Sequence, residues 1–174
     1  MEAGAVVAER FVIEARAGVG GMATVYRARD LVHGRESGGV VALKLLEAVS
    51  ERERFVREAE LLANLSHPNI VKYVAHGEMA DGQSFLAMEW LEGESLAERL
   101  KRESLSTDDA LRVCAKIADA LGHAHARGIV HRDVKPSNLM LPKGSSLDDV
   151  RVLDFGIARQ GVRRDLTRTG MLVG

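Results

Sequence analysis

One loop, residues 131–138, constrains this chain more than any other segment. It lies between short β-rich runs and packs a carboxylate, two cations and an amide into eight residues, an array that solubility alone does not require. In such a loop Asp133 could accept the proton of an incoming hydroxyl group, Lys135 could neutralise charge on a moving phosphoryl group, and Asn138 could bind Mg²⁺. These residue types therefore predict a site for phosphoryl transfer.

A second carboxylate follows this loop after a short predicted hairpin. In Asp154-Phe155-Gly156, the aspartate comes directly after the short strand or loop run 150–153. Asp154 is therefore a candidate second metal ligand. Gly156 permits a sharp backbone turn because it lacks a Cβ atom.

A lysine inside an apolar strand supplies a candidate phosphate-binding cation. The run 40–45 is rich in β-forming residues and includes Lys44. An ammonium group there is costly unless its charge is paired. Glu58, in the predicted helix that follows, could pair with it, and a phosphate could share it. An edge-strand lysine that points to solvent is the alternative, and the strand alone leaves both interpretations open.

A glycine-rich turn, Gly18-Val19-Gly20-Gly21, precedes that strand. Backbone N–H groups can approach phosphate oxygens closely there because no Cβ atoms intervene. No helix follows directly, as a dinucleotide-binding turn requires, and no Gly-Lys-Ser/Thr follows, as a Walker loop requires. For this segment taken alone, an ordinary glycine-rich turn is the alternative.

The remaining patterns locate the secondary structure. Strands are predicted at 11–15, 24–27, 40–45, 70–73 and 85–90, with a turn at Asp81-Gly82. Capping boxes predict helix starts at Ser50 with Glu53 and at Ser95 with Glu98. A long helix is predicted at 108–127. Its apolar stripe contains Leu111, Cys114, Ile117, Ala118, Leu121 and His125.

Taken together, these segments resemble the protein kinase signature set in order and in spacing. The matching residues are Gly18-x-Gly20-Gly21-Met22-x-x-Val25, Val41-Ala42-Leu43-Lys44, His131-Arg132-Asp133-x-Lys135-x-x-Asn138 and Asp154-Phe155-Gly156. The resemblance covers residues from about 11 to 174. Gly21-Met22 and residues 155–159 are similar to the bacterial Ser/Thr kinase branch, and a lysine two residues after the loop aspartate is the Ser/Thr pattern. Ala23 replaces the third glycine of the phosphate loop, a small change.

The resemblance implies an α+β, protein-kinase-like fold with two lobes. A strand-rich small lobe would span 1–89, a hinge 90–94, and a partial, helix-led large lobe 95–174. It also implies that residue 174 falls within the activation segment, before the Ala-Pro-Glu motif and the later helices of the family. Leaving the stripe of the 108–127 helix in water would cost several kcal/mol at about 25 cal/mol per Å², so we expect an isolated chain to be marginally stable.

The resemblance also implies a role for each matching residue. Asp133 would be the catalytic base, Lys135 the phosphate-side cation, and Lys44 would pair with Glu58. Mg²⁺, or Mn²⁺ in its place, would bind Asn138 and Asp154. The ATP site would contain Ala17, Gly18, Val19, Gly20, Gly21, Val25, Ala42, Lys44, Met88, Glu89, Leu91, Ser95 and Met140.

Regulatory features follow from the same resemblance. Arg132 would capture a phosphate on the activation segment, where Thr167 and Thr169 are the candidate phosphorylation sites. Two exposed loop hydroxyls without a role are the alternative for these threonines. A column of stacked side chains linking the lobes would contain Leu62, Tyr73, His131 and Phe155.

Composition excludes several other classes of function. A net charge of −1 gives no reason to expect nucleic acid as a general partner, and no run approaches the length of a membrane span. The single cysteine, Cys114, excludes an internal disulfide framework, and its place in a periodic helix predicts burial. We expect a cytoplasmic segment, although a longer parent could be membrane-anchored.

Two functions are consistent with these patterns. The first is a protein kinase that uses Mg-ATP, acts on protein substrates bearing Ser or Thr, and has the option of pairing as a homodimer. The second is a truncated, non-catalytic chain that only binds nucleotide or serves as a pseudokinase-like interaction module.

Overall fold

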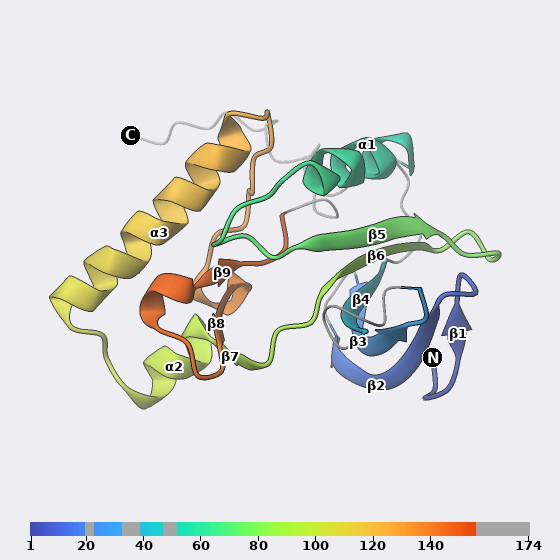
Figure 1. Cartoon of the computed structure of the whole chain (residues 1–174), viewed down its shortest axis with the longest axis horizontal. Helices are drawn as coiled ribbons and strands as arrows, with labels where there is room; N and C mark the ends of the chain where they lie inside the picture. Colours follow the sequence, from blue (N-terminus) through green and yellow to red (C-terminus); the bar gives the residue numbers. More distant parts are fainter. Residues whose placement is uncertain (20–22, 33–38, 47–51, 156–174) are drawn as a thin grey trace, which may run out of the picture.

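The computed structural model describes residues 1–19, 23–32, 39–46 and 52–155 (Figure 1). A six-stranded antiparallel sheet, in the order β1-β2-β3-β4-β6-β5, dominates the N-terminal part. Helix α1 (Arg52–Ala63) lies alongside β5. We refer to this sheet and α1 as the small lobe. Its strands are β1 (Val6–Val7), β2 (Phe11–Val19), β3 (Ala23–Asp30), β4 (Val40–Leu46), β5 (Tyr73–Glu78) and β6 (Ser84–Glu89).

The small-lobe sheet has two distinct faces because buried residues alternate along its central strand. In β4, Val41, Leu43 and Leu45 are buried and belong to the core of the sheet. Ala42 and Lys44, which lie between them, are only partly buried. Because successive side chains of a strand point to opposite faces, Ala42 and Lys44 share the face away from that core.

The large lobe begins at β7 and contains a second sheet of three antiparallel strands. Gly93 begins β7 with φ +153°, and a Cβ atom there would lie 2.1 Å from the carbonyl oxygen of Leu141. Only glycine therefore fits at this position. The described elements are β7 (Gly93–Ser95), α2 (Leu96–Arg102), α3 (Thr107–His125), the 3₁₀ turn η1 (Pro136–Asn138), β8 (Leu139–Pro142), the 3₁₀ turn η2 (Leu147–Asp149) and β9 (Arg151–Val152).

Side-chain caps begin both helices of the large lobe. The Ser95 hydroxyl accepts a hydrogen bond from the Glu98 N–H, and the Glu98 carboxylate accepts one from the Ser95 N–H. This confirms the capping box predicted for α2. Ser106 caps α3 by accepting from the Asp109 N–H. The capping box predicted at Ser50 lies outside the described residues.

The apolar stripe predicted for α3 is mostly exposed in the described structure, as the resemblance implied. Its buried residues are Val113, Ala120 and Ala124, whereas Leu111 is 64% exposed and Cys114 is also exposed. The prediction of a buried Cys114 is therefore wrong. At about 100° per residue, the predicted stripe lies roughly a third of a turn away from the face that packs on the described core. The helix has two apolar faces, and the sequence period alone does not show which one is covered.

The predicted strand at 70–73 is also displaced. Strand β5 begins only at Tyr73, and the preceding residues contact the large lobe instead. Ile70 forms an isolated parallel bridge with Val152, and the Val71 N–H donates to the Val152 carbonyl oxygen at 3.1 Å. Both are buried, so this apolar run forms part of the contact between the lobes.

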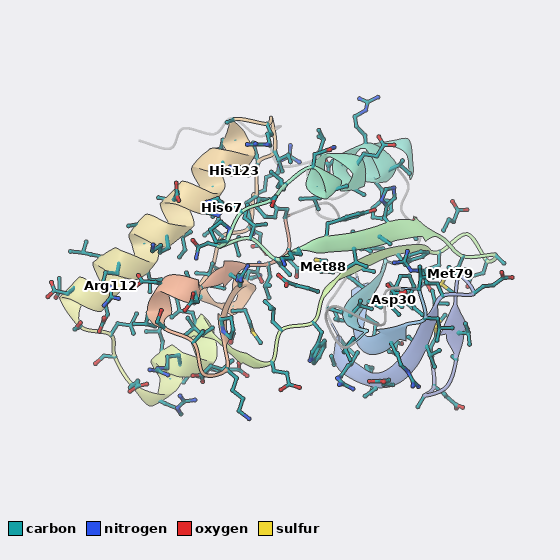
Figure 2. All side chains as sticks on the ribbon, in the orientation of Figure 1. Asp30, His67, Met79, Met88, Arg112 and His123 are labelled. Atoms are coloured by element: carbon teal, nitrogen blue, oxygen red, sulfur yellow. The ribbon has the colours of Figure 1, made fainter. Side chains whose placement is uncertain are left out.

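One hydrophobic core joins the two lobes. It includes Leu62 of α1 and Met88 of β6 together with Ala120 of α3, Val150 and Phe155. Figure 2 shows Met88 where the two lobes meet. In the part of the chain that the structure describes, we find no helix with the length and apolar character needed to span a membrane.

Candidate functional site

Two predicted catalytic-loop side chains, Lys135 and Asn138, converge on the carboxylate of a third residue, Asp133. Asp133 Oδ2 lies 2.9 Å from Lys135 Nζ and 3.0 Å from Asn138 Nδ2. The same amide nitrogen donates to the Asp133 carbonyl oxygen at 2.9 Å. Pro136 starts η1, the short turn that brings Asn138 back onto Asp133. The loop therefore holds a carboxylate, the group that a general base for a hydroxyl requires, with a cation beside it.

His131 anchors this loop to the strand that leads to Asp154. Its Nδ1 accepts the Asp133 N–H at 3.2 Å, so its Nε2 carries the proton and donates to the Leu153 carbonyl oxygen at 2.6 Å. The ring is 1% exposed and lies 4.8 Å from the Phe155 ring. Burial lowers the pKa of His131, although the hydrogen bond to Leu153 opposes this. His131 is therefore a neutral structural anchor.

Acidification from about pH 7 to about pH 5.5 is expected to destabilise the chain. Burial lowers the pKa of His131 and of His123, so below the ordinary histidine pKa of about 6.5 the unfolded chain binds more protons than the folded one. Carboxylates with lowered pKa values, such as Glu94 and Asp148, lose their contribution only near about pH 4 and below. Urea midpoints at the two pH values measure the effect. His123→Phe keeps a ring without a titrating group, so its urea midpoint should change less with pH. An equal change in wild type and variant would contradict a contribution from His123.

The two candidate metal ligands are held next to each other. The Leu153 N–H donates to the Asn138 carbonyl oxygen at 2.9 Å, and Asp154 follows Leu153 directly. Because the Asn138 amide nitrogen points to Asp133, its side-chain oxygen is the group that faces away from the carboxylate. Asp154 has φ +51°, a left-handed conformation that is rare for a residue with a side chain. Such strain is common where a fold positions a functional group.

Lys44 reaches this metal-ligand pair from the small lobe. Its Nζ donates to Asp154 Oδ1 at 2.7 Å, and its side chain is 18% exposed. A lysine in an apolar strand requires such a partner, and the alternative of a lysine in open solvent does not describe this structure. An ammonium group can bind phosphate, and a carboxylate can bind the metal ion that accompanies it. The pair therefore indicates where phosphates would lie.

Glu58 contacts a different partner from the one predicted. Its Oε1 lies 3.6 Å from Arg132 Nη1, whereas the Lys44 ammonium is on Asp154. The structure therefore differs from the expected Lys44–Glu58 pair. Arg132, next to Asp133 in the chain, takes φ +62°. Its guanidinium points toward the Glu58 carboxylate of α1. Asp154 meanwhile supplies the negative charge that Lys44 needs.

The predicted adenine-side residues of the small lobe lie on the face that carries Lys44. In the sheet register, Val25 is opposite Lys44 and Ala42 is opposite Met88. Directly opposed residues of antiparallel strands point to the same face. Gly18 is opposite Val25, and Ala17 falls at the irregularity in the β2–β3 register between Arg16 and Gly18. The register therefore places these positions near Lys44. Val19, at the end of β2, is 69% exposed.

The remaining predicted nucleotide residues lie at the junction of the lobes. Met140 of β8 pairs with Ser95 of β7, and the Ser95 hydroxyl is committed to the cap of α2. Leu91 packs against the core that joins the lobes. The Glu89 N–H donates to the Lys72 carbonyl oxygen at 2.9 Å, and its side chain accepts from the Lys72 N–H at 2.8 Å. These contacts fix the end of β6, just before the predicted hinge.

The four side chains of the predicted column lie near one another. Leu62, Tyr73 and Phe155 line one small cavity of about 20 Å³, together with Met88. Phe155 also packs on the His131 ring. Tyr73 additionally donates to or accepts from His76 at 2.6 Å. The four predicted side chains thus connect α1 to the catalytic loop.

Two predicted groups lie outside the described residues. They are Gly20 and Gly21 of the phosphate loop, and Thr167 and Thr169. Conversely, the sequence interpretation assigned no role to Asn69. Asn69 is 4% exposed and donates two side-chain hydrogen bonds to the large lobe. Its place between Pro68 and the apolar pair Ile70-Val71 was the available signal.

Comparison with known proteins assigns the class to which this fold and site belong. Residues 11–171 match the protein kinase domain family, and the chain therefore belongs to the protein kinase family. Similar relatives are bacterial serine/threonine-protein kinases. Pkn3 of Myxococcus xanthus is 39% identical over 182 residues, which cover 98% of this chain and 32% of that protein. PknJ of Mycobacterium tuberculosis is 39% identical over 176 residues, covering 99% and 29%. The chain thus spans about a third of these relatives.

Solved structures confirm the expected kinase fold. The kinase domain of M. tuberculosis PknI has a TM-score of 0.79 and 32% identity, with 92% of this chain and 63% of that chain covered. Rad53 in complex with AMP-PNP has a TM-score of 0.72 and 29% identity, covering 85% of this chain and 38% of that one.

Proposed function

We propose that this chain carries the nucleotide-binding and phosphoryl-transfer site of a protein Ser/Thr kinase. The observation that carries the proposal is the convergence of Lys135 and Asn138 on Asp133, beside the Lys44–Asp154 pair. The names of the relatives support Ser and Thr hydroxyls of proteins as the acceptors. On this proposal residues 1–89 and 95–174 contribute the two sides of the site, and 90–94 form the hinge.

Each catalytic-loop residue has a defined task in the proposed transfer. Asp133 orients the acceptor hydroxyl and takes its proton as the new oxygen–phosphorus bond forms. Lys135, 2.9 Å from the Asp133 carboxylate, stabilises the negative charge on the moving phosphoryl group. Asn138 keeps the Asp133 carboxylate in place through its amide nitrogen. The electron pair of the broken bond leaves with ADP.

The residues present fit a divalent cation bound together with phosphates. Across the described ranges, no group of three His, Cys, Asp or Glu side chains has the geometry for a metal ion. Mg²⁺ commonly takes one or two carboxylates and completes its shell with phosphates and waters. Asp154 and the Asn138 side-chain oxygen supply such a partial set, and Mg²⁺ or Mn²⁺ would neutralise phosphate charge there. Lys44, on the same carboxylate, would share the phosphates.

ATP fits the apolar face that leads from these polar groups to the hinge. Val25, Ala42 and Met140 would enclose the adenine, with Met88 at its inner end, since the β-sheet register places the small-lobe members on one face. The backbone of Glu89 and Leu91 would hydrogen-bond the base. Glycine backbone at 18, 20 and 21 would cover the phosphates.

Regulation by phosphorylation would act through Arg132. This guanidinium is 40% exposed and its neighbour in the structure is Glu58, at 3.6 Å. A phosphate on Thr167 or Thr169 would compete with the Glu58 carboxylate for Arg132, because it carries more charge. Glu58 would then be available to Lys44. The structure, on this proposal, corresponds to a state in which that exchange has not occurred.

Phosphoryl transfer by the purified 174-residue chain tests the proposal. The chain is incubated with Mg-ATP and a generic protein substrate, and the phosphate gained is read by intact mass. Transfer is expected, and it should disappear when Asp133 is replaced. A folded chain that neither transfers phosphate nor binds Mg-nucleotide would overturn the proposal.

A second candidate function is nucleotide binding without transfer. The Lys44–Asp154 pair favours it, since binding phosphates and their metal ion needs no general base. A folded chain that binds Mg-ATP but transfers no phosphate would support this alternative.

A further inference from the structure

A buried asparagine outside the catalytic loop ties the small lobe to the strand that precedes Asp154. Asn69 lies in the connection between α1 and β5 and is 4% exposed. Its side-chain nitrogen donates to the carbonyl oxygens of Asp148 and Val150, each at 2.8 Å. Both amide hydrogens are therefore used. The two acceptors lie within η2 and just before β9, so Asn69 closes the turn that leads into β9.

Backbone hydrogen bonds extend this contact to both candidate metal ligands. The Val152 N–H donates to the Asn69 carbonyl oxygen at 2.8 Å. The next residue, Leu153, donates its N–H to the Asn138 carbonyl oxygen at 2.9 Å, and Asp154 follows it. One path of short contacts therefore runs from Asn69 along β9 to Asn138 and Asp154.

A histidine fixes the turn that contains Asn69. His67 Nδ1 accepts the Asn69 N–H at 3.1 Å, and His67 Nε2 lies 3.2 Å from Asp119 Oδ2 of α3. The His67 side chain is 9% exposed, and its ring centre lies 5.1 Å from that of His123. Figure 2 shows His67 close to His123 of α3. The turn is therefore held between α3 on one side and β9 on the other.

We propose that Asn69 is a positioning residue for the divalent-metal site, acting through β9. The inference rests on the proposed function, because it concerns how Asn138 and Asp154 hold a cation with the nucleotide. Asn69 touches neither ligand. Its contacts set the path of residues 148–152, and the next two residues carry the hydrogen bond to Asn138 and the Asp154 carboxylate. Groups that orient metal ligands from outside tune metal affinity strongly.

Asn69→Ala separates this role from general packing. The substitution removes both donors and leaves the carbonyl oxygens of Asp148 and Val150 without them, while the backbone bond from Val152 can persist. We expect the gain in ADP affinity on adding Mg²⁺ to fall by about 10-fold, with affinity in EDTA almost unchanged. Hydrogen exchange at the Val152 and Leu153 amides should become faster. Asn69→Ser is smaller but keeps one donor, so its Mg²⁺ gain should lie between those of the wild type and Asn69→Ala. It also guards against loss of folding in the alanine variant.

The chain offers a matched control in the same segment. Asn64 also donates its side-chain amide to a backbone carbonyl, that of Glu60 at 2.9 Å, but it is exposed and this bond is made to α1. Asn64→Ala should leave the Mg²⁺ gain and both exchange rates as in the wild type. Arg10→Ala removes a bidentate partner of Asp30 in the small-lobe sheet, and should lower stability without changing the Mg²⁺ gain.

The outcomes separate the inference from the function on which it rests. Calorimetric titration of each protein with ADP, in EDTA and in Mg²⁺, gives the gain. If folded Asn69→Ala and Asn69→Ser keep the wild-type gain, or if Arg10→Ala loses as much, the positioning role is wrong. A wild-type chain that binds no nucleotide in either condition would instead overturn the proposed function, and the metal role of Asn69 with it.

Discussion

Replacing Asp133 with asparagine is expected to lower phosphoryl transfer by at least ~10²-fold while leaving Mg-nucleotide binding close to the wild-type value. The substitution keeps the size of the side chain and an oxygen that can accept from Lys135 and Asn138, at present 2.9 and 3.0 Å away. The amide, however, cannot take the proton of an acceptor hydroxyl. The loss should therefore fall on the rate of the chemical step rather than on affinity.

Asp108→Asn provides the control for this experiment. Asp108 lies in the first turn of α3 and undergoes the same chemical change away from the catalytic loop. Transfer is followed with excess Mg-ATP and a generic protein substrate, and ADP affinity is measured separately. Equal transfer by wild type and Asp133→Asn would exclude Asp133 as the base, whereas a parallel loss of ADP binding would indicate that the substitution disrupts the site itself.

Local sequence was sufficient to predict the segments that carry chemistry. The run 131–138 and Asp154 could be assigned roles because each role depends on residue type and short-range order, and Asn138 does return onto Asp133 within one turn. The β-rich run 40–45 likewise predicted that Lys44 would lie in an apolar strand. The capping box of Ser95 and Glu98 was predicted because both of its bonds are made within four residues.

Contacts between distant segments could not be predicted in the same way. Lys44 and Asp154 are 110 positions apart, and a lysine pairs with whichever carboxylate the packing of the lobes brings nearest. Asn69 resembles an ordinary loop asparagine until the turn before β9 is placed against it. Cys114 lies on an apolar face of α3, but the face covered in the described structure is the one with Val113. In each case tertiary packing decided between local options that were equally acceptable.

Asp154→Asn is expected to abolish the gain in nucleotide affinity on adding Mg²⁺ and to lower phosphoryl transfer by ~10² to 10³-fold, because several kcal/mol of charge stabilisation is lost with the metal. The same substitution should lower the melting temperature of the nucleotide-free chain. Lys44 donates to Asp154 at 2.7 Å and is 18% exposed, so removing the carboxylate leaves a largely buried ammonium group without this partner.

A double mutant separates these two effects. Lys44→Met with Asp154→Asn removes both charges, so the melting temperature should recover relative to Asp154→Asn alone, while Mg²⁺-dependent binding stays lost. Thermal unfolding and ADP titration in EDTA and in Mg²⁺ measure the two quantities on the same samples. If binding recovers together with stability, the loss in the single variant came from misfolding. If stability recovers without binding, the carboxylate that pairs with Lys44 is also the one that serves the metal.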